Sequence, residues 1–266
     1  MTDTPASMTY GDYLALDSVL SAQHPLSPHH DELLFIIIHQ TKELWLKQAI
    51  RELHIAKELV RAGALVEVHK ALSRVSRIQA VMTLSWDVLT TMTPADYSSF
   101  RDVLGSSSGF QSAQFRQFEY HLGLKDGGHL RFQAEGTEAY SDLLHALHAP
   151  SLWDDANAAL AKAGFDIPVE VLERDWSRPY APSPGVEAAW TQVYRDPERW
   201  WPFYQLAEKL VDIDDALAVW RHKHVVTVER IIGAKRGTGG TAGVAYLQST
   251  VGKRAFPELW SLRTSL

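Results

Sequence analysis

The sequence of 266 residues contains no cysteine, which excludes every form of chemistry that needs a thiol. Disulfides cannot form, and thiolate-held iron–sulfur clusters, thiolate-ligated haem and covalently attached c-type haem are also excluded. A chain without cysteine is typical of a reducing compartment. A haem group could bind only non-covalently and through another ligand, for which histidine is the simplest candidate.

Long hydrophobic runs and a surplus of positive charge are lacking as well. The longest fully apolar run, residues 33–38, is much shorter than the ~20 residues that span a membrane. Residues 1–9 do not show the basic and then apolar pattern of a secretory signal. A net charge of −6 disfavours nucleic acid, whose binding proteins usually carry a basic stripe. We therefore expect a cytoplasmic protein with neither a membrane nor nucleic acid as its partner.

Apolar residues recur at steps of three and four along most of the chain, and this period predicts an all-α fold. We expect a bundle of long helices that encloses a haem-sized pocket, with short helices between them. The long helices are expected over residues 28–61, 65–92 and 197–234. Shorter ones are expected over residues 94–104, 110–122, 137–147 and 151–163, and the tail from residue 246 should hold one helix and an end segment.

Local signals support several of these boundaries. Ser27-Pro28 and Thr93-Pro94 both read as an N-cap followed by proline at the first helical position. Residues 164–185 are rich in proline and glycine, so we expect an irregular segment there, which is a candidate insertion. We expect one domain that covers residues 1–266.

His224 lies within an apolar stripe of the last long helix. The stripe comprises Leu210, Ile213, Leu217, Trp220, Val228 and Ile231. His222 lies about 200° around the helix from it and should face elsewhere. A core histidine that hydrogen-bonds a neighbour explains this placement, and so does a ligand of haem iron, since imidazole and an apolar wall suit a porphyrin. Spacing alone leaves both interpretations open.

Two pairs at i and i+4 share helix faces. Phe35 and His39 lie in a nearly apolar segment, where they could line an aromatic pocket or form part of an ordinary core. Tyr97 and Arg101 combine a hydroxyl with a planar guanidinium, which suits a small-molecule carboxylate. A surface arginine stacked on a tyrosine would give the same pattern.

Residues 235–243 contain four glycines, which would allow a loop to close over a ligand with Thr238 and Thr241 offering hydroxyls. The segment lacks the P-loop pattern and follows a helix, so nucleotide binding is disfavoured. The sequence has no Glu-x-x-His and no His-Glu-x-x-His, which counts against a di-iron carboxylate bundle and a zinc protease.

Together these segments resemble the tryptophan 2,3-dioxygenase family from about residue 8 to the C-terminus, in the family's order. The matching stretches are TYGDYL (9–14), HDELLFIIIHQ (30–40), ELW (43–45), FR (100–101), SGFQS (108–112), QFR (114–116), WRHKH (220–224) and KRGTGG (235–240). Residues 105–107 depart from the family, since many relatives have proline at or beside the middle position. The departure affects loop stiffness more than chemistry.

The resemblance implies a haem-dependent dioxygenase that cleaves the C2–C3 bond of the L-tryptophan indole with O2. The product would be N-formyl-L-kynurenine, in the first step of tryptophan catabolism by the kynurenine route. One non-covalent haem b per subunit and a homotetramer are also implied. His224 matches the proximal iron ligand, and Ser108 matches a residue near a haem propionate.

The resemblance further assigns the substrate-binding residues. His39 matches the distal histidine that hydrogen-bonds the indole N–H, and Phe35 matches the residue that packs on the ring. Arg101 matches the clamp on the substrate carboxylate, with Tyr97 assisting. The remaining matches are Thr238, which meets the ammonium and carboxylate, and Tyr10 and Tyr13, which reach a neighbouring subunit's pocket.

Three alternatives stay open at this point. One is a related haem dioxygenase of wider indoleamine scope, against which His39 speaks. Another is a haem-binding sensor or carrier without turnover, against which Arg101 and the glycine-rich loop speak. The last is a helical bundle without a cofactor.

Overall fold

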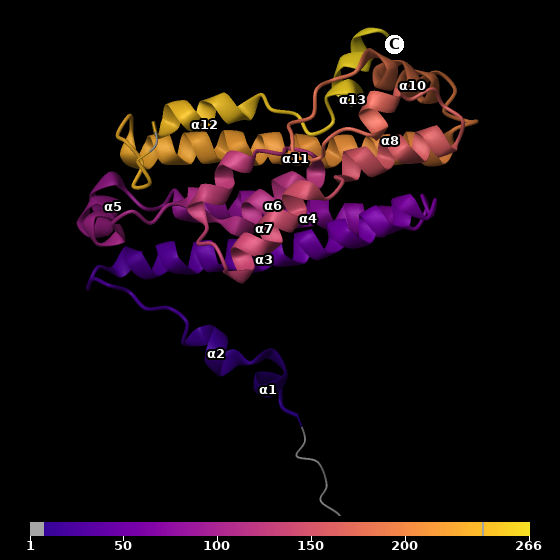
Figure 1. Ribbon diagram of the computed structural model, residues 1–266. Helices are drawn as coiled ribbons and strands as arrows, with labels where there is room; N and C mark the ends of the chain where they lie inside the picture. The colour runs from indigo at the N-terminus through magenta and orange to yellow at the C-terminus, as the bar shows by residue number, and fades with distance from the viewer. Residues whose placement is uncertain (1–7, 241) are drawn as a thin grey trace, which may run out of the picture.

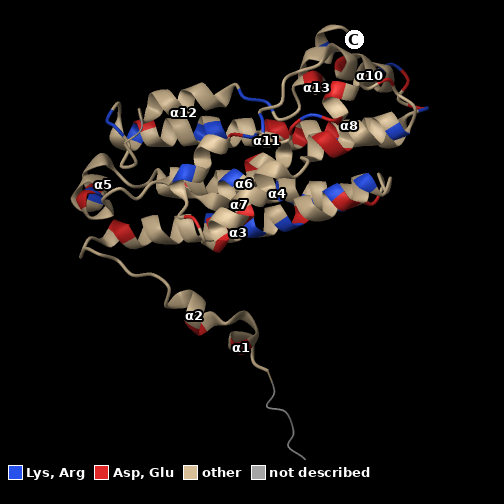
Figure 2. Ribbon diagram, in the orientation of Figure 1, with Lys and Arg blue, Asp and Glu red and all other residues tan. Residues whose placement is uncertain are grey.

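The computed structural model describes residues 8–240 and 242–266, and in these two ranges all regular structure is helical (Figure 1). The all-α prediction is therefore confirmed. Within the described ranges, no helix is both long and apolar enough to cross a membrane. Lysine and arginine are mixed with aspartate and glutamate over the molecule (Figure 2).

The body of the molecule is built on three long helices, namely α3 (His30–Arg61), α4 (Val68–Leu89) and α11 (Trp201–Ile232). Helix α4 packs along both α3 and α11 and lies between them (Figure 1). Its buried residues recur at steps of three and four and form one stripe, and the Gln79 side chain on this stripe donates to the Ile213 carbonyl of α11 at 3.1 Å. All three correspond to the long helices expected from the sequence, with ends shifted by a few residues.

Shorter helices connect and cover these three. They are α5 (Pro94–Phe100), η1 (Arg101–Leu104), η2 (Gly109–Gln111), α6 (Ala113–Leu122), η3 (Gly127–Phe132), α7 (Glu138–His148), α8 (Leu152–Lys162), α9 (Val169–Leu172), α10 (Pro184–Arg195), α12 (Val244–Val251), α13 (Pro257–Ser261) and η4 (Leu262–Thr264). Helices α6 and α8 pack against α3, and α12 lies along α11. Stacked Trp153 and Trp190 join α8 to α10 in the core, with ring centroids 5.5 Å apart.

One of the two expected N-caps is confirmed and the other is wrong. Thr93 caps α5, because its hydroxyl accepts from the Asp96 N–H at 3.3 Å while the Asp96 carboxylate accepts from the Thr93 N–H at 2.8 Å. Helix α3 instead begins at His30, with no side-chain cap at His29. Ser27 donates its hydroxyl and its N–H to the Glu32 carboxylate, so the chain before α3 folds back onto the helix's first turn.

Other boundaries also differ from expectation. The helix expected over 94–104 changes to 3-10 geometry at Arg101, and the one expected over 110–122 is divided into η2 and α6. The sequence did not predict α10, although Pro184 opens it at a position where proline is favoured. The tail holds α12, α13 and η4 rather than one helix and an end segment. Residues 164–185 are irregular apart from α9 and the first residues of α10, and Phe165, Ile167 and Val171 anchor them in the core.

An N-terminal arm lies outside the bundle (Figure 1). It contains α1 (Tyr10–Leu14) and α2 (Leu16–Leu20), which Ala15 joins in a left-handed conformation with φ of 50°. Neither helix buries a residue against the rest of the chain.

Candidate functional site

The site is centred on two histidines from the helices that flank α4. His39 belongs to α3 and His224 to α11. Burial, together with the charge of Lys42, lowers the pKa of His39 to about 4. Burial first, and then Lys42, His39 and Arg116, lower the pKa of His224 to about 3. Both imidazoles are therefore uncharged at neutral pH, and the uncharged ring is the form that binds metals.

One hydrogen bond fixes the tautomer of His39. Its Nδ1 lies 2.7 Å from the carbonyl oxygen of Phe35. A carbonyl can only accept, so Nδ1 carries the proton and Nε2 is left with a lone pair. His39 is thus prepared to accept a hydrogen bond from a ligand N–H.

Aromatic rings surround His39. The Phe35 ring lies 4.2 Å from the His39 ring, as the i, i+4 spacing predicted. Tyr97 and Phe100 of α5 complete the wall, with centroids 6.0 and 5.8 Å from Phe35. Helices α3 and α5 together therefore provide a surface suited to a flat aromatic ligand.

Arg101 lies where α5 gives way to η1, one helical turn after Tyr97, and its backbone N–H donates to the Tyr97 carbonyl oxygen. Its guanidinium donates to the carbonyl oxygen of Arg236 at 2.6 Å. A second contact between the glycine-rich segment and the residues after η1 is made by Thr238, whose hydroxyl donates to the Ser107 carbonyl at 2.5 Å. These two bonds hold the glycine-rich segment onto η1 and the residues that follow it, a contact that we call the latch, and they place Thr238 in the same region as Arg101.

Ser108 and Gly239 are in close apposition at this latch. Ser108 caps η2, and a Cβ atom added to Gly239 would lie 2.7 Å from the Ser108 Cβ. Such a distance is a steric clash, so the approach requires glycine at position 239. Thr241, which the sequence suggested as a second hydroxyl, lies outside the described residues.

A second group of aromatic rings surrounds His224. Trp86 of α4 stacks on it with centroids 4.5 Å apart and planes 13° apart, and Trp220 lies 5.2 Å away. Phe115 of α6 stacks on Trp220 at 4.7 Å. His224 therefore faces an apolar wall, as its stripe predicted, whereas His222 is exposed.

This second group contains buried donors that have no acceptor among the described residues. They are Lys42 Nζ, Trp86 Nε1, Trp220 Nε1 and Arg116 Nε. Buried donors are normally paired, so their concentration here indicates an acceptor-rich ligand. Sequence reasoning did not single out Lys42, Trp86 or Arg116, although Lys42 shares a helix face with His39 at i+3. An imidazole, flat aromatic walls and unpaired donors fit a porphyrin with two carboxylates.

Tyr10 and Tyr13 lie far from both histidines of their own chain. They are on α1 in the arm, and each is 76% exposed. The bundle of one chain does not bring them to the site.

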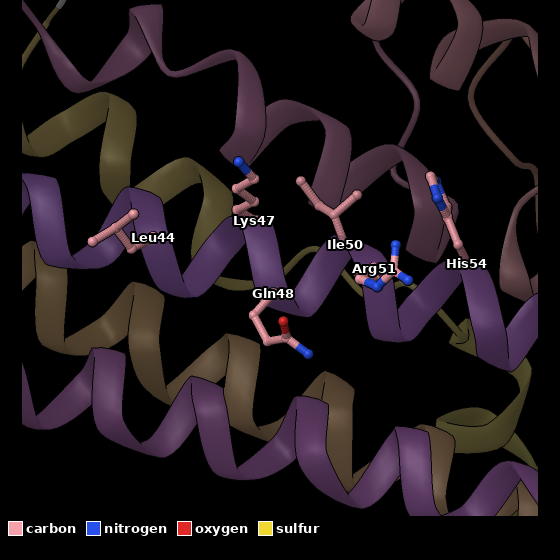
Figure 3. A pocket seen from close by; sticks show the side chains of 6 residues that line it. All are labelled: Leu44, Lys47, Gln48, Ile50, Arg51 and His54. Carbon is pink, nitrogen blue, oxygen red and sulfur yellow. The ribbon is translucent and has the colours of Figure 1, made fainter. Parts of the chain in front are cut away.

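Two surface hollows lie elsewhere. One runs along α3 and is lined by Leu44, Lys47, Gln48, Ile50, Arg51 and His54 (Figure 3). The other lies beside α10 and ends at Ser265. Neither is lined by His39 or His224. Next to the first, His54 Nε2 lies 2.9 Å from His121 Nε2 of α6.

Fold and geometry together define an all-α protein with a histidine-centred, aromatic-walled site beside a glycine-rich latch. The family model for tryptophan 2,3-dioxygenase matches residues 2–150 and 136–266. The chain belongs to the tryptophan 2,3-dioxygenase family.

Curated relatives match over nearly their whole length. A tryptophan 2,3-dioxygenase of Caulobacter vibrioides is 65% identical over 259 residues, covering 97% of this chain and 98% of the relative. One of Ralstonia pickettii is 53% identical over 99% of this chain and 95% of the relative. One of Bacillus anthracis is 52% identical over 100% of this chain and 95% of the relative.

Proposed function

We propose that this protein is a haem-dependent dioxygenase that cleaves the C2–C3 bond of the L-tryptophan indole with O2, giving N-formyl-L-kynurenine. This reaction is the first step of tryptophan catabolism by the kynurenine route. The observation that carries the proposal is the pairing of two half-buried, uncharged histidines with aromatic walls and unpaired donors, in a chain of this family.

His224 is the proposed iron ligand of one non-covalent haem b per chain. Its low pKa keeps the imidazole uncharged, so one ring nitrogen has a free lone pair, and Trp86 and Trp220 restrict the orientation of the ring. Trp86, Trp220 and Arg116 offer donors to the acceptor groups of a porphyrin, and Ser108 is proposed to lie near a propionate. When bound, haem supplies the oxygen chemistry, while the protein supplies ligand, orientation and exclusion of water.

His39 is proposed to orient the substrate. Its Nε2 accepts the indole N–H, because Nδ1 is engaged with the Phe35 carbonyl, and Phe35 packs on the indole ring. With a pKa of about 4, His39 is a weak base, and an indole N–H is a very weak acid. Hydrogen bonding therefore explains its role better than proton abstraction does.

Arg101 is proposed to clamp the substrate carboxylate through its planar fork, with Tyr97 assisting. Its described acceptor is the neutral Arg236 carbonyl, so its charge is available for an anion. Thr238 would meet the ammonium and carboxylate of the amino acid. The clamp sets the position of the indole, and a displacement near 1 Å could slow the reaction by on the order of 100-fold.

We further propose a homotetramer in which Tyr10 and Tyr13 of one chain reach the site of another. Their 76% exposure on an arm outside the bundle supports this proposal. A cytoplasmic location stays a prediction.

Turnover of L-tryptophan to N-formylkynurenine by the purified, reduced protein tests the function. Tryptamine lacks the carboxylate and would leave Arg101 unpaired, so we expect its turnover to be at least about 100-fold slower. His224→Ala should abolish or alter the haem Soret band. Comparable rates with tryptamine would favour the dioxygenase of wider scope. Haem binding without product would favour a sensor or carrier. A protein that stays colourless after haem supply would favour a bundle without a cofactor.

A further inference from the structure

Lys42 is a buried cation that the proposed reaction does not use. The residue is 6% exposed, and Nζ lies 3.0 Å from the ring centroid of Trp86. No hydrogen-bond acceptor for Nζ occurs among the described residues. An ammonium has three N–H donors, and one aromatic face satisfies only part of them. Burial of the charge is thus incompletely compensated by Trp86.

The charges near Lys42 do not offer it a partner. Lys42 follows His39 by three residues on α3, and the Trp86 ring beneath its Nζ stacks on His224, so it lies close to both histidines. Arg116, the other cation that acts on His224, is paired with Glu119 at 2.6 Å, and Glu119 is shared with Arg221. The pKa of Lys42 itself falls to about 7 through burial.

The nearest acidic residue in sequence is also engaged. The Glu43 carboxylate accepts from the Ser112 hydroxyl at 2.6 Å and the Gln114 amide at 2.8 Å. Glu43 therefore connects α3 to α6 and does not form an ion pair with Lys42. We infer that a bound ligand supplies the anion that pairs with the Lys42 ammonium.

We propose that Lys42 is the counter-ion of a buried carboxylate, and that this carboxylate is a propionate of haem. The inference rests on the proposed function. Two carboxylates could enter this site, those of the cofactor and that of the amino-acid substrate. Arg101 and Tyr97 are the groups proposed for the substrate carboxylate, whereas Lys42 lies on the Trp86 ring that stacks on His224, the proposed iron ligand. The position of Lys42 over Trp86 is therefore on the side of the site that we assign to haem.

The test compares haem release from three variants of the full-length holoenzyme. Lys42→Met removes the charge with little change in shape, and Lys42→Arg keeps the charge. Lys47→Met is the matched control, because Lys47 is an exposed residue of the same helix that lines the surface hollow in Figure 3. Haem transfer to excess apomyoglobin gives the release rate, and a spectroscopic titration gives the affinity for L-tryptophan.

We expect Lys42→Met to release haem about tenfold faster than wild type, because the propionate would be left buried without its partner. Lys42→Arg should stay within about threefold of wild type, and Lys47→Met should not change, while L-tryptophan affinity stays constant in all three. The haem-free chain gives a second readout. Lys42→Met should resist urea better than the wild-type chain, because it removes a charge that has no partner without haem.

Other outcomes overturn the inference. Unchanged haem release with weakened L-tryptophan binding would assign Lys42 to the substrate carboxylate. Unchanged release with a less stable haem-free Lys42→Met chain would reduce Lys42 to a packing role on Trp86. In both cases wild-type haem binding through His224 would leave the proposed function standing. A wild-type protein that binds no haem would overturn both the inference about Lys42 and the proposed function.

Discussion

At the scale of single residues, burial keeps several bases uncharged, away from the site as well as within it. His121 is buried in α6, where its Nε2 meets His54 and its Nδ1 lies 3.5 Å from Lys57 Nζ. Burial first, and then the Lys57 charge, lower the pKa of His121 well below its usual value. The native protein therefore excludes a proton that the unfolded chain accepts.

This exclusion predicts acid sensitivity. Above a pH of about 6.5 neither state protonates His121, so its contribution is constant. As pH falls below that value the unfolded chain binds one more proton, and the free energy of unfolding decreases by up to ~1.4 kcal/mol per pH unit for this group. His121→Gln should make the decrease shallower by about one proton in urea titrations between pH 7.5 and 5. Exposed His222→Gln is the control, and identical slopes for wild type and His121→Gln would contradict the prediction.

Residue-scale expectations from sequence were accurate where spacing carries the information. The i, i+4 pairs Phe35–His39 and Tyr97–Arg101 share faces as expected, since helical geometry alone decides this. The burial of Lys42 was not predictable in the same way. A lysine on a helix normally faces water, and its position over Trp86 depends on how α3 meets α4. The use of these residues with haem and L-tryptophan stays a prediction.

At the scale of elements, the latch between the glycine-rich segment and η1 depends on Gly239. A side chain there would collide with Ser108, while Arg101 and Thr238 hold the two segments together. Gly239→Ala should therefore push the segment away and disturb the clamp without touching His224. We expect the KM for L-tryptophan to rise several-fold with an unchanged Soret band.

Gly252→Ala provides the matched control, because nothing lies within 4 Å of a Cβ atom at that position. Its kinetics should equal those of wild type. If Gly239→Ala kept a wild-type KM, or if it lost haem, the latch would not act on substrate binding in the way described.

Element boundaries followed the sequence wherever a local signal decided them. Thr93 caps α5 because the hydroxyl, the carboxylate three residues later and proline act within one turn. Ser27 carries the same type of signal, but Glu32 accepts from the Leu26 and Ser27 N–H groups and from the Ser27 hydroxyl, and the helix begins only at His30. The sequence did not predict helix α10 because Pro184-Gly185 is typical of a turn. In the structure, however, a buried helical stripe follows, formed by Val186, Ala189, Trp190 and Val193. Tertiary burial of that stripe outweighs the local signal.

At the scale of the whole molecule, the exposed arm supports the proposed exchange between chains. Mixing tests it. A tetramer of Arg101→Ala chains has intact arms, and one of Tyr10→Ala/Tyr13→Ala chains has intact clamps. If arms reach neighbouring sites, reassembled mixtures should contain complete sites and be more active than either parent. No recovery in mixtures, where co-purification through a tag on one parent shows that mixed assemblies have formed, would mean that each arm serves its own chain.

Helix α4 contributes neither histidine, yet it packs along both helices that do. The side chains on its buried stripe therefore help to set how far apart the two imidazoles are held. A change of side-chain volume near Trp86, towards the C-terminal end of α4, would displace both histidines at once. A screen for inactive mutants should therefore recover substitutions in α4 that mimic damage to the chemistry while contacting neither ring.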